Sequence, residues 1–287
     1  TTDQKSTLSS SELSYLRGVR TAEQPSGALR TRLDNGGLLG DIVNSSPVFV
    51  GSPRATNRDQ SPYPTSELYT DFVNDYDDRT AMIYVGANDG MLHGFDATNG
   101  QELFAYVPSL VIDATERFNN QLDNFTSSFY LHDYYVDLAP RLNDVYMHPE
   151  GVGGKDWLTV LVGGLGAGGK GFFALDVTDP SLLFASEGSA RNAVLWEFGH
   201  DDDTYPLDTN GNPLGGAIGA ITDPTGQPVK DLGYSISLPS IAMSNVKDTD
   251  TEQEWIAIFG NGPNSTSGIA TLFVLFMDKG RDGWGSG

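Results

Sequence analysis

Short apolar runs alternate with turn-forming residues along nearly the whole chain. Runs rich in Val, Ile, Phe and Tyr are separated every few residues by Gly, Pro, Asn or Asp, which is typical of strands joined by tight turns. Strands are predicted at residues 47–51, 81–86, 91–96, 102–107, 158–163, 171–177, 194–198, 255–259 and 270–276. Another strand region is expected near residues 234–243. The pattern therefore predicts an all-β protein.

Helical periodicity is weak. Within residues 109–120, Leu110, Val111, Ala114 and Phe118 could line one side of a short helix. Segments dense in Pro, Gly, Asn, Asp and Ser read instead as long loops or small hairpins. Irregular insertions are expected at residues 53–79, 119–149 and 201–230.

A diffuse internal repeat groups the predicted strands. Each unit has an apolar strand, a Gly-rich turn and a second strand, and the first two units continue into an aromatic strand. The units are residues 83–100, 161–180 and, more loosely, 256–280. Asp96 and Asp176 close the second strand, where their carboxylates can accept backbone N–H groups of the following turn. Strand, turn, strand, turn and aromatic strand predict a four-stranded propeller blade.

The repeat predicts a β-propeller with quinoprotein-like blades and long loop insertions, and this ring is incomplete. Three recognisable units are too few to close a ring, and an open arc exposes unpaired strand edges, which proteins normally cover or pair. Further sequence or a partner chain is therefore expected to complete the ring. The domain assignment is a lead-in segment at residues 1–38 and a propeller domain at residues 39–287, with its C-terminal blades missing.

Charge and composition narrow the classes of partner. The chain has 287 residues, 17 Lys and Arg against 38 Asp and Glu, a formal charge of -21 and no cysteine. This acidity disfavours nucleic acid and anionic lipid, and favours divalent cations or partners with basic patches. The absence of cysteine excludes disulfides, thiolate metal sites and thiol nucleophiles.

No segment reads as a membrane span or a signal peptide. The longest apolar run, residues 269–277, is shorter than the roughly 20 residues that a bilayer span needs. Residues 1–11 are polar and lack the charged-then-apolar order of a secretion signal, so any such signal is expected to lie outside this chain.

The glycine-rich segment at residues 164–171 satisfies G-x-G-x-x-G and resembles a Walker A loop. Gly171 stands where a magnesium-binding hydroxyl is needed, and residues 172–177 read as a strand rather than a helix. Without a helix N-terminus a phosphate meets no helix dipole. A hairpin connection within one blade is the preferred interpretation.

Calcium is the one cofactor that the sequence leaves open, and its ligands are not assigned. Residues 208–212 and 248–252 place oxygen ligands at alternate positions, as calcium loops do, but neither segment completes the loop pattern. Metal-ligating residues are therefore unknown.

No catalytic or cofactor-binding residue is assigned. The histidines form no metal pair such as H-x-x-x-H, and no G-x-S-x-G elbow supplies a nucleophile; they are His93, His132, His148 and His200. The tryptophans in the predicted strands are interpreted as packing between blades rather than as a sugar platform; they are Trp157, Trp196 and Trp255. The chain is predicted not to be an enzyme.

Two stretches carry a family resemblance. Residues 39–48, followed by residues 84–96, resemble the propeller domain of the PilY/PilC proteins of type IV pili. Other segments agree in kind and order, so the resemblance covers nearly the whole chain; they are residues 15–18, 102–108, 163–180 and 259–262. The repeat is also similar to quinoprotein dehydrogenase propellers, so a dehydrogenase is the first alternative. A secreted carbohydrate-binding propeller is the second.

The resemblance implies a secreted protein at the pilus tip or outer cell surface. Such a protein supports pilus assembly, opposes retraction and mediates adhesion by binding minor pilins and a host, cell or abiotic surface. Family members usually carry a variable N-terminal region, and their propeller continues beyond the segment at residues 259–262 into a calcium loop, neither of which is found in this sequence.

Overall fold

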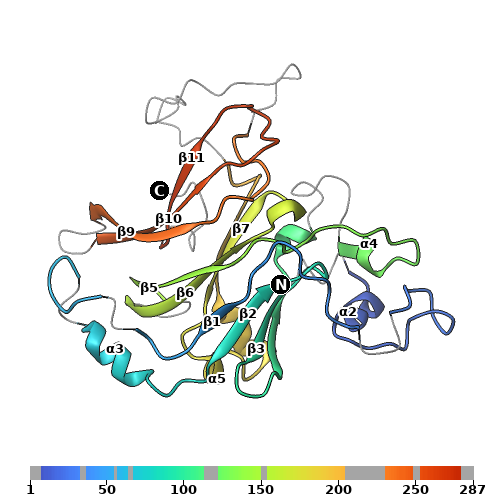
Figure 1. Cartoon of the computed structure of the whole chain (residues 1–287), viewed down its shortest axis with the longest axis horizontal. Helices are drawn as coiled ribbons and strands as arrows, with labels where there is room; N and C mark the ends of the chain where they lie inside the picture. The colour runs from blue at the N-terminus through green and yellow to red at the C-terminus, as the bar shows by residue number, and fades with distance from the viewer. Residues whose placement is uncertain are drawn as a thin grey trace.

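The strands of the chain form three antiparallel sheets that follow one another in sequence (Figure 1). The computed structural model describes residues 8–32, 37–54, 57–63, 67–112, 122–149, 154–203, 230–247 and 253–278. Sheet 1 has the order β1-β2-β3-β4, sheet 2 the order β5-β6-β7-β8, and sheet 3 the order β11-β10-β9. Each sheet is a meander, because consecutive strands are neighbours. The described residues form no closed ring of sheets.

The strand bounds follow the predicted apolar runs closely. The strands are β1 Val48–Val50, β2 Met82–Gly86, β3 Leu92–Asp96, β4 Glu102–Tyr106, β5 Arg141–Met147, β6 Asp156–Gly164, β7 Gly171–Asp176, β8 Val194–Gly199, β9 Ser240–Lys247, β10 Gln253–Gly260 and β11 Leu272–Phe276. The helices are short: α2 Ser10–Leu16, α3 Tyr69–Asp75, α4 Leu122–Thr126, α5 Pro180–Leu183 and α6 Glu187–Ala190, with 3-10 turns η1 Ser109–Val111, η2 Gly166–Gly168 and η3 Arg191–Ala193.

The turn that follows the second strand of the repeat has the predicted chemistry. Asp96 Oδ1 accepts the backbone N–H of Thr98 at 2.7 Å. Gly100, at the end of the same turn, has a φ of +76°, which glycine adopts without steric cost. In sheet 2, Asp176 Oδ1 accepts the N–H of Thr178 at 2.9 Å. The prediction that these aspartates anchor their turns is confirmed.

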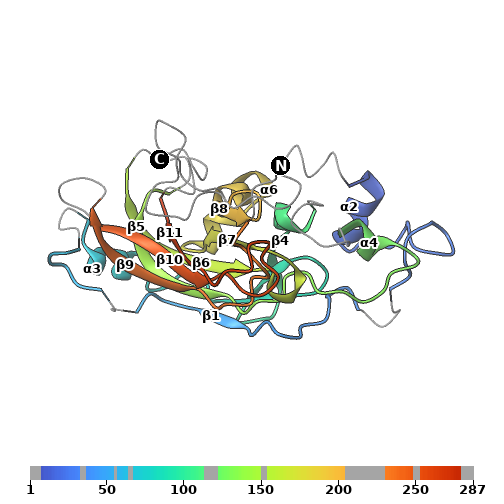
Figure 2. The same ribbon diagram turned by 90° about the horizontal axis from the view of Figure 1, so that it is seen from above.

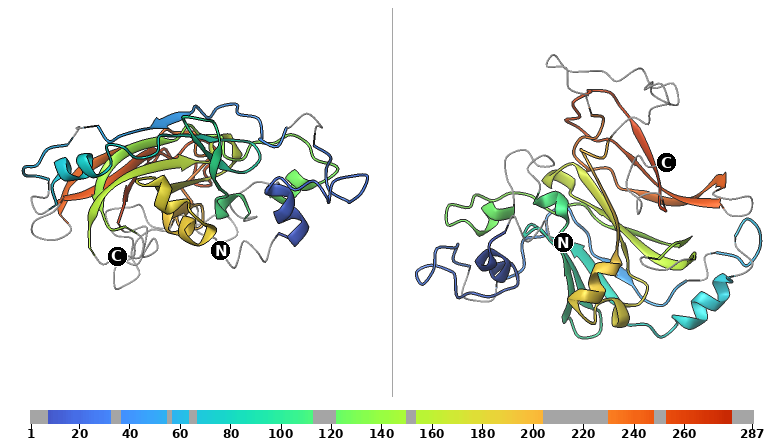
Figure 3. Two further views of the ribbon diagram at one scale, coloured as in Figure 1. Left: turned by 90° about the horizontal axis from the view of Figure 1, so that it is seen from below. Right: turned by 180° about the vertical axis from the view of Figure 1, so that it is seen from behind.

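Sheet 2 lies between the other two sheets and is buried on both faces (Figure 3). One face contributes Leu161, Phe173 and Leu175 to a core shared with sheet 1. The opposite face contributes a second group of apolar side chains to a core shared with sheet 3 and with helix α3; it includes Val160, Val162, Phe172 and Trp196. Such double burial explains the near-continuous apolar sequence of β6 and β7.

Several predictions of where strands and insertions begin and end were wrong. Strand β5 lies inside residues 119–149, which were expected to be an insertion, because polar Asn143 and Asp144 hide its alternating pattern. Helix α3 lies inside the insertion expected at residues 53–79. Strand β9 begins near the end of the region predicted at residues 234–243.

The remaining expectations are only partly covered. Of the predicted helix at residues 109–120, the turn η1 is present, and residues 113–121 lie outside the described residues. Most of the insertion expected at residues 201–230 lies outside them as well.

The lead-in segment folds against helix α4, to one side of the sheets (Figure 2). The Arg32 guanidinium donates to Glu23 Oε1 at 2.8 Å, and both side chains are buried. It also lies over the Tyr15 ring, 3.8 Å from the ring centroid. Arg30 lies over the rings of Phe125 and Tyr130, which belong to helix α4 and the loop that follows it. Cation–π and charged hydrogen bonds therefore tie residues 8–32 to the connection between sheets 1 and 2.

Candidate functional site

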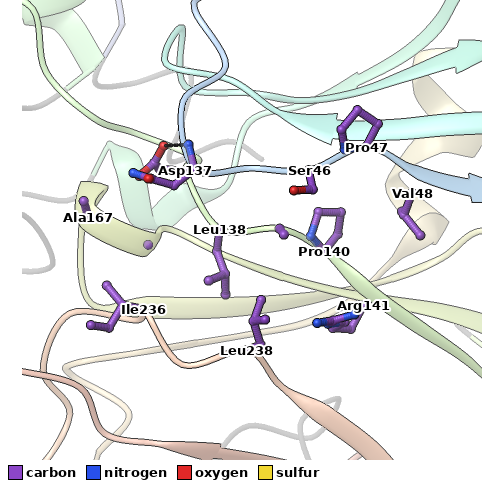
Figure 4. Close-up of a pocket in the computed structure, with 13 residues that line it drawn as sticks. Ser46, Pro47, Val48, Asp137, Leu138, Pro140, Arg141, Ala167, Ile236 and Leu238 are labelled. Carbon is purple, nitrogen blue, oxygen red and sulfur yellow. Dashed lines mark hydrogen bonds between the residues drawn. The ribbon is translucent and has the colours of Figure 1, made fainter.

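A cavity of about 660 Å³ lies where the first strand of each sheet begins (Figure 4). We call it the first-strand pocket. It is lined by Asn44, Ser46, Pro47, Val48, Asp137, Leu138, Ala139, Pro140, Arg141, Gly166, Ala167, Ile236 and Leu238. These residues come from the segments that lead into β1, β5 and β9 and from the turn η2. The pocket is therefore a shared product of all three sheets.

Repeated local chemistry brings these segments together. A proline immediately precedes each first strand, at Pro47, Pro140 and Pro239. Proline has no N–H to donate, so it suits the first residue of an edge strand. Ser45 Oγ accepts the N–H of Gly86 at 3.0 Å, and in sheet 3 a second serine accepts the N–H of the corresponding glycine, Ser237 Oγ from Gly260 N, also at 3.0 Å. The repeat of Ser-x-Pro at residues 45–47 and 237–239 is the signal in the sequence that indicates this pocket.

The two ends of the pocket carry opposite charges. Asp137 is buried, and its carboxylate accepts both Asn44 N–H, at 3.1 Å, and Asn44 Nδ2, at 2.6 Å. Arg141 is exposed, and its guanidinium makes no hydrogen bond or ion pair to another residue within the described part of the chain. Asp137 thus has its two oxygens engaged, whereas Arg141 is available to a ligand.

The glycine-rich segment at residues 164–171 connects β6 to β7, as predicted, and residues 171–176 continue as a strand. Its backbone amides converge on one buried hydroxyl. Ser235 Oγ accepts the N–H groups of Leu165, at 3.1 Å, and Gly166, at 3.2 Å, and donates to Gly169 O at 3.1 Å. A hydroxyl of the segment leading into sheet 3 occupies the place that a phosphate would take in a nucleotide-binding loop.

His93 forms a cluster that the sequence did not reveal. Its Nδ1 lies 2.5 Å from Glu102 Oε1, and its Nε2 lies 3.1 Å from Asp89 Oδ1. Burial by itself lowers the pKa of the imidazole, but the hydrogen bonds and charges of Asp89 and Glu102 outweigh burial and raise this pKa to about 9. Asp89 Oδ2 also accepts the N–H of Gly40 at 2.6 Å. These contacts tie β3 to β4 through Glu102 and to the β2–β3 turn through Asp89.

A second buried polar cluster connects sheet 1 to sheet 2. Asp144 accepts the hydroxyls of Tyr69 and Thr159, both at 2.6 Å. Arg79 donates from Nη1 to Thr159 Oγ1 at 2.8 Å and to Thr178 O at 3.0 Å. Asp144 and Thr159 belong to strands β5 and β6, Thr178 follows β7, and Tyr69 and Arg79 come from the β1–β2 connection. The cluster therefore fixes how that connection of sheet 1 meets sheet 2.

The remaining tryptophan and histidine candidates pack in the core or form ion pairs, and the calcium candidates lie outside the described residues. Trp157, Trp196 and Trp255 are buried between sheets, which confirms that they pack in the core. His132 pairs with Asp41 at 2.8 Å in an exposed position. His148 pairs with Asp278 at 3.2 Å. The calcium candidates at residues 208–212 and 248–252 lie outside the described residues.

The described residues contain neither a metal-binding cluster nor a membrane-spanning helix. No group of three or more His, Asp or Glu side chains there could hold a metal ion. No helix in that part of the chain is long and apolar enough to cross a membrane.

Three consecutive antiparallel meander sheets, packed against one another with their first strands opening on one pocket, define a mostly β protein built from a repeated sheet. The family model described as the PilY1 β-propeller domain matches residues 39–281, and the chain belongs to this family. This finding confirms the family resemblance seen in the sequence.

Relatives with this family's name are similar to the chain over most of its length. The chain is 35% identical over 274 residues to "Type IV pilus biogenesis factor PilY1 homolog" of Xylella fastidiosa, covering 95% of this chain and 18% of the relative. It is 34% identical over 281 residues to "Type IV pilus biogenesis factor PilY1" of Pseudomonas aeruginosa strain PAK, covering 97% of this chain and 19% of the relative. The chain therefore spans less than a fifth of the length of these relatives, and neither of them is named as an enzyme.

A solved structure supports the fold. The crystal structure of the Pseudomonas aeruginosa PilY1 C-terminal domain matches with a TM-score of 0.52 and 33% identity. The match covers 81% of this chain and 35% of the solved one.

Proposed function

We propose that this chain is part of a type IV pilus biogenesis factor and acts by binding, not by catalysis. The observation that carries the proposal is the match of residues 39–281 to the PilY1 β-propeller domain. We infer a location outside the cell, at the pilus tip or the outer cell surface. Its partners there are minor pilins and a host, cell or abiotic surface.

The physical character of the chain supports a binding role. The sheets are held by buried apolar cores and by polar clusters whose groups bond to one another, as at Asp144 and His93. Long connections on a rigid β scaffold suit presentation to a partner. The charge of -21 favours partners with basic patches. Salt weakens this attraction, since charges are screened beyond about 8–10 Å.

We also propose that the propeller is completed by another sheet, from further sequence or from a partner chain. The outward face of sheet 3 is apolar, and two of its side chains, Leu272 and Val274, are exposed. The corresponding inward face of this sheet is buried against sheet 2. An exposed apolar sheet face of this kind is a surface that another blade would cover.

The test combines a cellular and a biochemical measurement. Deletion of the encoding gene is expected to reduce surface pili seen by microscopy, together with twitching and adhesion. The purified chain is expected to capture purified minor pilins in a pull-down, and more weakly at high salt. Normal piliation and adhesion, with no pilin captured, would refute the proposal.

The enzymatic alternative has a direct test of its own. Reconstitution with pyrroloquinoline quinone and calcium, followed by dye-linked alcohol oxidation, is expected to give no turnover. Measurable turnover would reassign the chain to the quinoprotein dehydrogenases. Selective binding on a glycan array would instead support a carbohydrate-binding propeller.

A further inference from the structure

We propose that the first-strand pocket binds a short extended peptide segment that carries aliphatic side chains and one carboxylate. The proposal stands on the geometry of the pocket and does not depend on the role of the chain in pili. It assigns a ligand class to a site built by all three sheets.

The walls of the pocket are apolar and accessible. Ile236 is 52% exposed and Leu238 is 45% exposed, although both residues lie close to the packed sheets (Figure 4). Val48 and Leu138 add further apolar surface. Covering a half-exposed side chain of this size removes apolar area from water, which is favourable. An aliphatic ligand therefore gains affinity here.

The available charge of the pocket is positive, in contrast to the chain as a whole. Asp137 is buried, and each of its carboxylate oxygens accepts one hydrogen bond from Asn44, so Arg141 is the exposed charge of the pocket. Arg141 lines the same pocket with an unengaged guanidinium, at the opposite end from Asp137 (Figure 4). A guanidinium matches a carboxylate in a bidentate geometry. A ligand with one carboxylate satisfies Arg141, whereas the charge of -21 repels a polyanion.

The backbone around the pocket favours an extended peptide over another apolar acid. The first strands β1, β5 and β9 each lie at the edge of their sheet. An edge strand presents backbone N–H and C=O groups along its free side, and an extended peptide can pair with them. Ser46, which is exposed beside the start of β1, adds a hydroxyl that can bond to a peptide group. These groups recognise a backbone, while Arg141 and the aliphatic wall recognise its side chains.

The test is a titration of the full chain, with methyl-labelled Ile and Leu, by two capped peptides followed by NMR. The probes are acetyl-Leu-Val-Leu-Asp-amide and acetyl-Leu-Val-Leu-Asn-amide, which differ only in the carboxylate. We expect the methyl signals of Ile236 and Leu238 to shift, and the Asp peptide to bind about tenfold more tightly than the Asn peptide, since a guanidinium bonds more strongly to a charged carboxylate than to a neutral amide. A tenfold preference corresponds to about 1.4 kcal/mol.

Two variants locate the selectivity. Arg141→Gln is expected to make the two peptides bind equally. Arg191→Gln, which removes the same charge from an exposed position in η3, is expected to keep the tenfold preference. Unshifted Ile236 and Leu238 methyls, or equal binding of both peptides to the unmodified chain, would overturn the proposal without reliance on any variant. So would an equal loss of preference in the Arg141 and Arg191 variants.

Discussion

The two junctions that bury sheet 2 are built from different chemistry. At the junction with sheet 3, aromatic rings meet: Phe172 stacks on Phe259 with ring centroids 3.8 Å apart, and Phe198 meets Phe273 edge-on at 5.5 Å. At the junction with sheet 1, Tyr106 meets Phe173 edge-on at 5.3 Å, and the buried cluster around Asp144 joins sheet 2 to the β1–β2 connection. The first junction relies mainly on burial of area, with directional bonds at Ser235 and from Asn143 Nδ2 to Ile241 O. The second adds a buried carboxylate that accepts two hydroxyls.

This difference shows how one repeated unit can hold its neighbours in two ways. Stacked rings tolerate small shifts, because dispersion and burial are not directional. A buried carboxylate that accepts two hydroxyls tolerates little displacement. A buried polar group that loses its hydrogen-bond partner costs free energy. We therefore expect the junction of sheets 2 and 3 to contribute more stability, and the junction of sheets 1 and 2 to set relative position more strictly.

The largest effect is expected at the aromatic junction. Phe259→Ala removes a buried ring that stacks on both Phe172 and Phe273, and it should lower the free energy of unfolding by about 3–5 kcal/mol. Urea denaturation followed by fluorescence measures this change. The matched control is Phe49→Ala, because Phe49 is 57% exposed and should cost under about 1 kcal/mol. Equal losses in the two variants would contradict the assignment of Phe259 to the junction.

A smaller but more specific effect is expected at the polar junction. Asp144→Ala removes the acceptor of the Thr159 hydroxyl and one of the two acceptors of the Tyr69 hydroxyl, the other being Arg54 O, and should cost about 2–3 kcal/mol. A double-mutant cycle with Tyr69→Phe isolates the hydrogen bond from the loss of packing. Strictly additive losses would show that the two groups do not interact, and the polar junction would then have no directional character.

The third effect depends on pH. The folded pKa of His93 is about 9, above the ordinary value of 6.5, so the stability that its ion pairs contribute is fully present below pH 6.5 and is lost as the pH rises through 9. His93→Gln should therefore destabilise the chain by about 2 kcal/mol at pH 6 and by much less at pH 10. Denaturation at both pH values measures the difference. His132→Gln is the control, because His132 is exposed and its loss should have little effect at either pH. A pH-independent loss at His93 would show that folding does not shift the pKa of this histidine.

The sequence predicted the features that depend on residues close together in the chain. The strands of the repeat and the turns anchored by Asp96 and Asp176 follow from local pattern and were correct. The polar cluster was not predictable, because Asp144 and Tyr69 are far apart in sequence and meet only when the sheets pack. The same polar residue hid strand β5.

The pocket had a signal in the sequence, whereas the histidine cluster had none. Each first strand follows a proline, so the start of the pocket could have been found by aligning Pro47, Pro140 and Pro239. Glu102, by contrast, reaches His93 only through the pairing of β3 with β4, where a register shift lies between Gly94 and Phe95. Irregular register is a property of the folded sheet and has no simple signal in the sequence.

A fourth effect is expected where the segment leading into sheet 3 fills the glycine-rich turn of sheet 2. Ser235→Ala removes a buried hydroxyl that accepts the N–H groups of Leu165 and Gly166, and should cost about 1–2 kcal/mol. Ser235→Thr keeps the hydroxyl and adds a methyl group, so it tests how much side-chain volume the site accepts. Chemical denaturation and amide hydrogen exchange of the turn measure both variants. Unchanged exchange in Ser235→Ala would show that the hydroxyl does not hold the turn.

The smallest effect is expected on the outward face of sheet 3, and it tests whether that face differs from the buried faces of sheet 2. Val274 is 46% exposed, so Val274→Ser should change the free energy of unfolding by about 0.5 kcal/mol or less. Val162 in sheet 2 is fully buried, and Val162→Ser places an unmatched hydroxyl in the core, at a cost of roughly 2 kcal/mol or more. Urea denaturation of the two variants compares one substitution on a covered and an uncovered face. A loss at Val274 as large as that at Val162 would show that the outward face is already covered, and sheet 3 would then need no further blade.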